Sequence, residues 1–455
     1  MSDDAKLWSK TISDVNEEVL VNLETPHPAY YIALSGAVLA LLVGVIFVGL
    51  EFVYGLGLWN FRPPVYWAVD ITNFVFWVGI GHAGTLISAI LFLFRAKWRN
   101  SVNRSAEAMT IFAVICAAVF PLIHMGRPWH GAIWALPLPN TNNLWINFRS
   151  PLVWDVFAIS TYFTTSLLFW YMGLVPDLAS IRDRVTGFKR LVYGVMSFGW
   201  RGTAKQWWYY EAGYGFLAAL ATPLVLSVHS VVSWDFAMSI QPGWHTTIFP
   251  PYFVAGAILS GCAMVYNLLI PVRYMFKLEK FILPEHLESC LRLTLLTSTI
   301  VFYAYSLEFF VAWYSGNPYE WALFAKRATG PYAFYFWVMM ACNCWFPLAF
   351  WSKRVRENIV VSYVICFAVN IGMWFERYNI IVSSLVEDFI PARWGHFEPG
   401  LWEIAITVGS FGLFMTFYLI FCKFFPIVSL SEIKLIMPKP MSPKPLKAGG
   451  EHHHG

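Results

Sequence analysis

Ten long apolar stretches constrain the fold of this chain more than any other feature of its sequence. A helix needs about 20 mostly apolar residues to cross the hydrocarbon core of a bilayer. Only 13% of the residues are charged, whereas soluble domains carry about 25%. The sequence therefore predicts an all-α integral membrane protein with about ten transmembrane helices. The stretches lie at residues 29–54, 66–94, 106–125, 151–175, 208–236, 250–273, 288–313, 330–352, 358–385 and 400–424.

The basic residues are unevenly divided between the two sets of connections. Most of the 31 Lys and Arg residues lie in the N-terminal arm, the C-terminal tail and every second loop. Cytoplasmic loops carry the excess of Lys and Arg, so both termini are predicted to be cytoplasmic. The net charge of +4, without a basic cluster, gives no indication of nucleic-acid binding. The opposite set of loops holds only Arg62, Arg127, Arg149, Lys326, Arg327 and Arg393.

A faint internal repeat predicts how the spans are grouped. Pro63-Pro64-Val65-Tyr66 opens the second span, and Pro250-Pro251-Tyr252 opens the sixth. Two four-helix bundles of parallel topology, with two peripheral helices, would produce this pattern. The predicted divisions are a cytoplasmic arm at 1–27, a peripheral first span at 28–65, a first bundle with the functional site at 66–240, a second bundle at 250–386, a peripheral tenth span at 400–425 and a cytoplasmic tail at 426–455.

Ionisable residues gather at the predicted outer ends of the spans. His124 ends the third span, Asp155 begins the fourth and Asp235 ends the fifth. Charged groups are costly in a membrane, so their presence there indicates function. An imidazole can accept one proton of a quinol, and a carboxylate can accept the other. The alternative is that each group only caps a helix end. The predicted quinol-binding residues are His124, Asp155, Asp235, His229, Asp70 and Trp129, with Trp134, Trp154 and Trp234 as apolar walls.

A second polar cluster is predicted in the seventh and ninth spans. It consists of Glu308, Glu376 and Arg377, and His82 lies near the middle of the second span. Neighbouring residues on a helix do not face each other, so we expect Glu376 and Arg377 to pair with other helices. The cluster is either an interhelical salt bridge or, with His82, a proton path. The cytoplasmic half of the protein is expected to be mostly an apolar plug.

The cysteine and histidine patterns give no sign of a bound metal or haem. All seven cysteines lie in or beside apolar stretches, without a CxxC or CxxCH motif. Haem in a membrane protein needs His pairs facing each other across helices, and only His82, His124 and His229 lie within spans. We therefore expect no metal, haem or iron–sulfur cluster in this chain. Oxidation of a quinol would then require a partner subunit that carries metal centres.

The segment FPLIHMGRPW, followed by SPLVWD, resembles the NrfD/PsrC family of membrane subunits of polysulfide-reductase-like complexes. The length and the two additional spans are most similar to the ActC subunits of bacterial alternative complex III. The resemblance covers roughly residues 28–425. It implies two four-helix bundles in a bacterial inner membrane, no bound redox cofactor, and a quinone pocket near the periplasmic face. By position, His124 and Asp155 fall on that pocket, with Asp235 as a third member.

The sequence and the resemblance together predict a quinol-oxidising membrane subunit of a respiratory or photosynthetic complex. Its substrate would be menaquinol or ubiquinol. Its partners would be the lipid bilayer, an iron–sulfur subunit, multihaem cytochrome subunits and a second NrfD-like membrane subunit. One alternative is a quinol-oxidising anchor of a molybdenum-type reductase. Another, from a different class, is a proton-conducting transporter.

Overall fold

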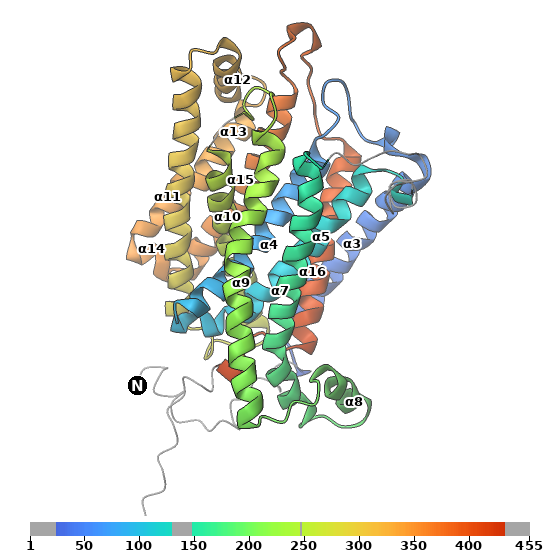
Figure 1. Ribbon diagram of the computed structural model, residues 1–455, viewed down its shortest axis with the longest axis vertical. Helices are drawn as coiled ribbons and strands as arrows, with labels where there is room; N and C mark the ends of the chain where they lie inside the picture. The colour runs from blue at the N-terminus through green and yellow to red at the C-terminus, as the bar shows by residue number, and fades with distance from the viewer. Residues whose placement is uncertain (1–23, 130–147, 246–247, 433–455) are drawn as a thin grey trace, which may run out of the picture.

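A computed structural model describes residues 24–129, 148–245 and 248–432. Figure 1 shows a bundle of long helices, with α8 at its lower end and α12 at its upper end. Ten described helical segments are long and apolar enough to cross a membrane, which confirms the predicted fold class. They are α3 (Ala29–Tyr54), α4 (Val69–Leu93), α5 (Asn103–His124), α7 (Pro151–Arg182), α9 (Ala204–Ala237), α10 (Phe249–Met275), α11 (Pro284–Tyr314), the segment Ala333–Trp351, α15 (Ile359–Leu385) and α16 (Leu401–Phe424).

The shorter elements connect these spans. Within the three described ranges there is no β-strand, and the only bridge joins Arg62 to Val65. The connecting helices are η1 (Leu56–Leu58), η2 (Lys97–Ser101), α8 (Gly187–Met196), α12 (Pro318–Thr329), α14 (Lys353–Glu357) and η5 (Pro391–Arg393).

The segment Ala333–Trp351 is an irregular helix. It begins as α13 (Ala333–Met340), widens into a π-helical turn η3 (Ala341–Trp345) and ends as the 3-10 helix η4 (Phe346–Trp351). Pro347 lies in the last part, where a proline cannot donate a hydrogen bond to the preceding turn. The π-helical turn carries Asn343, whose amide donates to the hydroxyl of Tyr305 at 3.0 Å.

Successive spans alternate in direction, so each end of the bundle holds five helix starts and five helix ends. The end at which α5 finishes is called the His124 end, and the end at which it begins is called the Arg104 end. The loops 55–68, 238–245, 315–332 and 386–400 also belong to the His124 end. Which end faces the cytoplasm stays a prediction from the basic residues.

Helix contacts show which spans are neighbours. α4 packs against α5 and α9, and α7 packs against α9 and α5. In the other half, α10 packs against α11 and α15, which both contact η3 and η4. α3 and α16 pack mainly against each other, and α16 also contacts α5. The proposed domain limits stay a prediction, since α4 and α10 also share a large interface.

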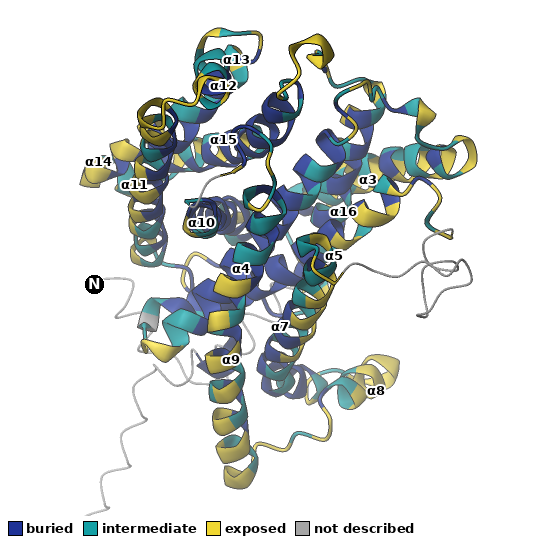
Figure 2. Ribbon diagram, turned by 45° about the horizontal axis from the view of Figure 1, so that its top comes forward, coloured by how far each residue is buried: buried dark blue, intermediate teal, exposed yellow. Residues whose placement is uncertain are grey.

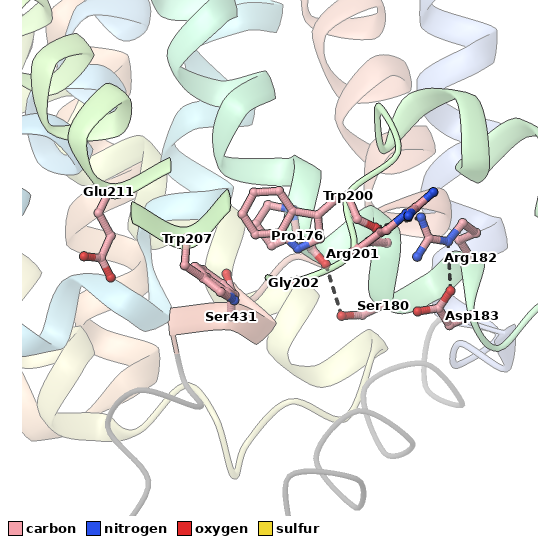
Figure 3. A pocket seen from close by; sticks show the side chains of 11 residues that line it. Pro176, Ser180, Arg182, Asp183, Trp200, Arg201, Gly202, Trp207, Glu211 and Ser431 are labelled. Atoms are coloured by element: carbon pink, nitrogen blue, oxygen red, sulfur yellow. Dashed lines mark hydrogen bonds and ion pairs between the residues drawn. The ribbon is translucent and has the colours of Figure 1, made fainter. Parts of the chain in front are cut away.

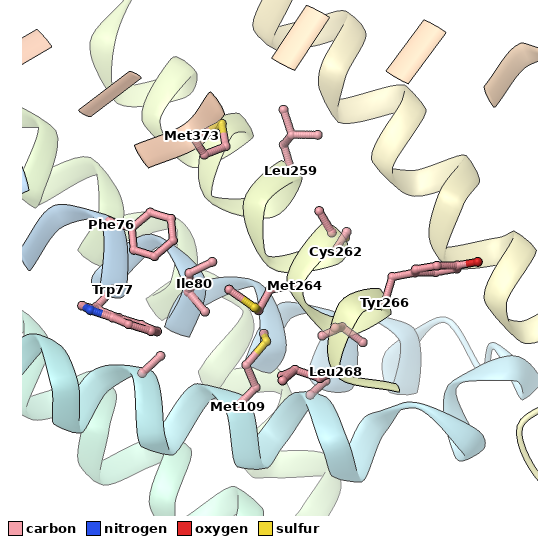
Figure 4. Close-up of a cluster of buried hydrophobic side chains, with 14 of the residues drawn as sticks. Phe76, Trp77, Ile80, Met109, Leu259, Cys262, Met264, Tyr266, Leu268 and Met373 are labelled. Carbon is pink, nitrogen blue, oxygen red and sulfur yellow. The ribbon is translucent and has the colours of Figure 1, made fainter. Parts of the chain in front are cut away.

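The α4–α10 interface is the centre of the molecule. Both helices are almost entirely buried (Figure 2). Ile80 of α4, Met264 of α10 and Met109 of α5 lie close together in this apolar cluster (Figure 4). The two backbones can approach closely because Gly261 has no side chain. A Cβ atom added there would lie only 1.9 Å from the Cβ of Ala83. Small residues of this kind are common where membrane helices pack.

A buried charge cluster lies at the Arg104 end, where an apolar plug was expected. The guanidinium of Arg104 contacts Glu107 and Asp177, each at 3.0 Å, and donates to the carbonyl of Gly173 at 2.6 Å. All three charged side chains are fully buried. Nearby, Arg99 pairs with Glu432 at 2.7 Å. The expectation was wrong because α5 begins at Asn103, so residues assigned to the loop lie inside the fold.

Candidate functional site

His124 and Asp70 form a hydrogen-bonded pair at the His124 end. His124 is the last residue of α5, and Asp70 is in the first turn of α4. The Nδ1 atom of His124 bonds to Oδ2 of Asp70, and Oδ1 of Asp70 accepts from the N–H of Ala68 at 2.9 Å. The aspartate is buried, whereas 30% of the His124 side chain is exposed. A carboxylate on Nδ1 orients the ring and leaves Nε2 to accept a proton.

Aromatic residues and a second carboxyl group surround this pair. The ring of Trp67 meets the ring of His124 edge to face at 5.9 Å. Glu51, near the end of α3, is fully buried and interacts electrostatically with Asp70 and His124. The indole of Trp59 lies beside Glu51, but neither carboxyl oxygen has a hydrogen-bond partner of ordinary geometry among the described residues. Glu51 is absent from the site predicted from the sequence, although its position within an apolar span was a signal.

Asp155 and Asp235 form a second pair at the same end. Asp155 lies in the first turns of α7, and Asp235 lies in the last turn of α9. Their carboxyl groups are within hydrogen-bonding reach of each other. The rings of the preceding residues, Trp154 and Trp234, meet edge to face at 6.1 Å. Two carboxylates this close repel each other when both are ionised, so such a pair holds a proton readily.

The three residues predicted to be catalytic therefore fall into two pairs. His124 contacts Asp70, and Asp155 contacts Asp235. The pairs are on neighbouring helices, since α5 packs against α7 and α4 packs against α9. The part of the segment between α5 and α7 at residues 130–147 lies outside the described residues, and so does Trp134. Trp129 is partly exposed and meets Phe52 of α3 edge to face at 6.1 Å.

His229 lies away from these pairs, near the middle of the bundle. It is fully buried in α9, and its ring lies 5.0 Å from that of His82 in α4. The ring of His82 stacks on Tyr162 of α7 at 4.4 Å. On its other side, the ring of His229 lies against that of Phe253 of α10, with the ring centroids 5.8 Å apart. A role for His229 in quinol binding stays a prediction, and the structure groups this residue with His82.

Glu376 and Arg377 pair with each other, contrary to our expectation. The guanidinium of Arg377 lies 2.8 Å from Glu376 and rests 4.4 Å above the ring of Phe253. The side chains are long enough for their ends to meet although their Cα atoms are adjacent. Glu376 also accepts a hydrogen bond from Tyr305, so one partner does lie on another helix.

Glu308 lies on the edge of a cavity of about 200 Å³ at the His124 end. The loop residues Gly243 and His245 and the α12 residue Glu320 also border it. Burial raises the pKa of the Glu320 carboxyl, although the N–H of Gly243 and the charge of Arg327 act in the opposite direction. Glu308 interacts electrostatically with Arg327 and with Glu376. The second polar cluster therefore has a route to the surface.

A larger pocket of about 530 Å³ lies at the Arg104 end, at the opposite end of the bundle from the predicted site. Trp200 and Trp207 line it together with Arg182, Asp183 and Glu211 (Figure 3). Arg182 and Asp183 form an ion pair at 2.8 Å. In the described part of the chain, no group of three or more His, Cys, Asp and Glu side chains is arranged to hold a metal ion.

Comparison with known proteins identifies relatives of this chain. Residues 57–387 match the family model described as "Polysulphide reductase, NrfD". The chain is also 26% identical over 232 residues to a putative membrane subunit of a dimethyl sulfoxide reductase from Halobacterium salinarum. That match spans about half of each protein, 48% of this chain and 48% of the relative.

The family match covers the spans from α4 to α15, and it includes both the Asp70–His124 pair and the Asp155–Asp235 pair. The chain is a multi-pass membrane protein by its ten apolar helices. These findings together show that the chain belongs to the NrfD family of membrane subunits.

Proposed function

We propose that this chain is the quinol-oxidising membrane subunit of an electron-transfer complex. The observation that carries the proposal is the Asp70–His124 pair. Asp70 occupies Nδ1 of the imidazole, so Nε2 is available to a proton donor in a partly exposed position at the His124 end. A hydroxyl group of a membrane-borne quinol fits this arrangement, because catalytic bases of this kind are held by a carboxylate on the opposite ring nitrogen.

The proposed reaction breaks both O–H bonds of the hydroquinone ring. One proton goes to Nε2 of His124, and the other goes to the carboxyl pair of Asp155 and Asp235. Two electrons leave the ring, which becomes the quinone, and pass to metal centres of a partner subunit at the His124 end. Menaquinol and ubiquinol both satisfy this chemistry. We propose that this end faces the periplasm of a bacterial inner membrane, in agreement with the distribution of basic residues.

The partner subunit distinguishes two versions of the proposal. In the first, the chain is an ActC-like subunit that works with an iron–sulfur subunit, multihaem cytochromes and a second NrfD-like subunit. In the second, it is the quinol-oxidising anchor of a molybdenum-type reductase, which the similarity to a dimethyl sulfoxide reductase membrane subunit supports. Mass spectrometry of the subunits that copurify with the chain decides between them. Haem cytochromes favour the first version, and a molybdenum protein favours the second.

The carboxyl pair provides a test of the proposed function. In the purified complex, Asp155→Asn and Asp235→Asn are each expected to slow quinol oxidation by about tenfold to 100-fold, because an amide cannot accept the second proton. Turnover is measured with an artificial electron acceptor, and assembly is checked by native gel electrophoresis. Asp388→Asn, in a partly exposed ion pair with Arg393 at the same end, is the matched control. Wild-type turnover in both test variants would contradict the assignment of the pair.

A second function, proton conduction, is favoured by a line of polar side chains across the bundle. From the Arg104 end, Glu107 accepts from Ser88 and lies at 3.0 Å from the hydroxyl of Tyr214. One turn of α4 closer to the His124 end, the hydroxyl of Thr85 accepts a hydrogen bond from Tyr162 at 2.9 Å. This tyrosine stacks on His82, which leads to His229. Beyond Phe253, the line continues through Arg377, Glu376 and Tyr305 towards Glu308 and its cavity.

Proton conduction predicts a separation between turnover and proton transport. In liposomes containing the complex, Glu376→Gln is expected to keep quinol oxidation within about twofold of wild type and to reduce proton transport by about tenfold, because the amide blocks the path but lies away from the quinol pocket. A pH-sensitive dye inside the vesicles measures transport. Glu288→Gln, whose partners are the two arginines Arg292 and Arg356, is the control. Equal transport by both variants would exclude Glu376 from the path.

A further inference from the structure

An apolar slot of about 320 Å³ lies between α3, α5 and α16. Leu41 to Phe52 of α3 bound it over a length of about 16 Å at 1.5 Å per residue. Its other walls come from the α5 residues Cys116, Val119, Phe120 and Ile123 and from α16. The hydroxyl of Ser410 in the slot is already satisfied, since it donates to Thr407 and accepts from Trp77. The slot therefore suits a narrow hydrocarbon chain.

The slot opens sideways towards lipid. Val45 lines the slot and is 57% exposed on the outer surface of α3. Gly49, one turn further, also lines it, and a Cβ atom added there would meet no atom within 4 Å. Closer to the Arg104 end, α3 and α16 are in close contact, since a Cβ atom added at Gly44 would lie 2.6 Å from the Cα of Gly409. A chain can thus enter beside Gly49 without separating the two helices.

The other end of the slot leads to the polar groups of the candidate site. Glu51 follows Val48 by three residues on α3, and His124 follows Phe120 by four residues on α5. Residues at these spacings lie on the same face of a helix. Glu51 and His124 therefore lie at the end of the slot, next to the lining residues Phe52 and Ile123, and they interact electrostatically. An apolar slot that ends at a base and a buried carboxyl group matches a molecule with a proton-donating ring on a hydrocarbon tail.

We infer that this slot binds the isoprenoid tail of the quinol whose ring reaches His124, an inference that rests on the proposed function. The tail enters beside Val45 and Gly49 and lies between α3 and α5, and its ring is held against Glu51, Asp70 and His124. A phospholipid acyl chain would fill the same apolar space, but its phosphate group would meet the carboxyl groups of Glu51 and Asp70. Repulsion between these negative charges favours the uncharged quinol.

The inference is tested with Gly49→Phe, which places a ring at the slot opening, where an added Cβ atom meets no other atom within 4 Å. Gly36→Phe is the matched control, because Gly36 is also an exposed glycine of α3 with free space around it but lies outside the slot. The assembled complex is assayed with two quinols of identical ring, one with a long isoprenoid tail and one with a methyl group in its place. For the long-tailed quinol, KM is expected to rise about tenfold in Gly49→Phe relative to Gly36→Phe, with kcat little changed.

The tail-free quinol separates the possible outcomes. Its KM is expected to be the same in both variants, within about twofold, because the substitution leaves the ring site intact. Equal KM values of the two variants for the long-tailed quinol would overturn the inference. The inference would also be overturned if Gly49→Phe lost bound phospholipid, measured by mass spectrometry, without a change in its KM for the long-tailed quinol. If the wild-type complex oxidises neither quinol, the proposed function itself fails, which is a different result from an insensitive slot.

Discussion

His124→Ala is expected to reduce quinol oxidation by about 100-fold or more, the usual contribution of a general base. The imidazole is held through Nδ1 by a buried aspartate, so its removal deletes the base and leaves Asp70 with only its hydrogen bond from the N–H of Ala68. Assembly is expected to persist, because His124 is the last residue of α5 and is partly exposed. The measurement is quinol-dependent reduction of an artificial acceptor by the purified complex.

Two comparisons make the His124 result specific. His396→Ala removes an exposed imidazole at the same end, paired with Glu398 at 3.1 Å, and is expected to retain full activity. Added imidazole is expected to restore part of the turnover of His124→Ala, since the small base can enter the space left by the side chain. Wild-type turnover of His124→Ala in a fully assembled complex would remove His124 from the mechanism.

Arg104→Met is expected to lower the free energy of unfolding by about 3–5 kcal/mol, the cost of removing one partner from a buried ion pair. Arg104 contacts both Glu107 and Asp177, and all three are fully buried. Without the guanidinium, two buried carboxylates lose the positive charge that they share. Unfolding of the purified protein in mixed micelles, followed by tryptophan fluorescence, measures the change.

The control for this variant is Arg292→Met, which removes an arginine that is 65% exposed and paired with Glu288. Its expected effect is below about 1 kcal/mol, since exposed ion pairs contribute little. A triple variant, Arg104→Met with Glu107→Gln and Asp177→Asn, is expected to recover part of the lost stability, because no unpaired charge remains. If Arg104→Met is as stable as Arg292→Met, the cluster does not stabilise the fold.

The spans could be predicted from the sequence because the bilayer sets both their length and their composition. The stretch predicted at 29–54 is helix α3, and the one at 358–385 differs from α15 by one residue at its start. The boundaries were less accurate where helices continue beyond the apolar region. α7 extends to Arg182, and α9 begins at Ala204 because Thr203 and Gln206 form a capping box ahead of the apolar residues.

The site could be predicted only in part, because the pairing of side chains depends on which helices are neighbours. The cost of burying ionisable groups directed attention to His124, Asp155 and Asp235, and the structure places all three at one end. Their partners could not be deduced from spacing. Asp70 is 54 residues from His124, and only the packing of α4 on α5 makes them a pair. The hydrogen bond of Glu376 to Tyr305 depends in the same way on the packing of both α11 and α15 against α10 and η3.

The contact between α3 and α16 joins the first and the last of the ten described spans, which has a consequence for biosynthesis. A ribosome that adds about 5–20 residues per second completes α16 only after tens of seconds. During that interval α3 has inserted into the membrane, but the glycine surface at Gly44 still faces lipid in place of Gly409. The wall that α16 contributes to the slot is also missing until then. The newly made protein would therefore complete the slot only when α16 inserts beside α3, as the final step of assembly.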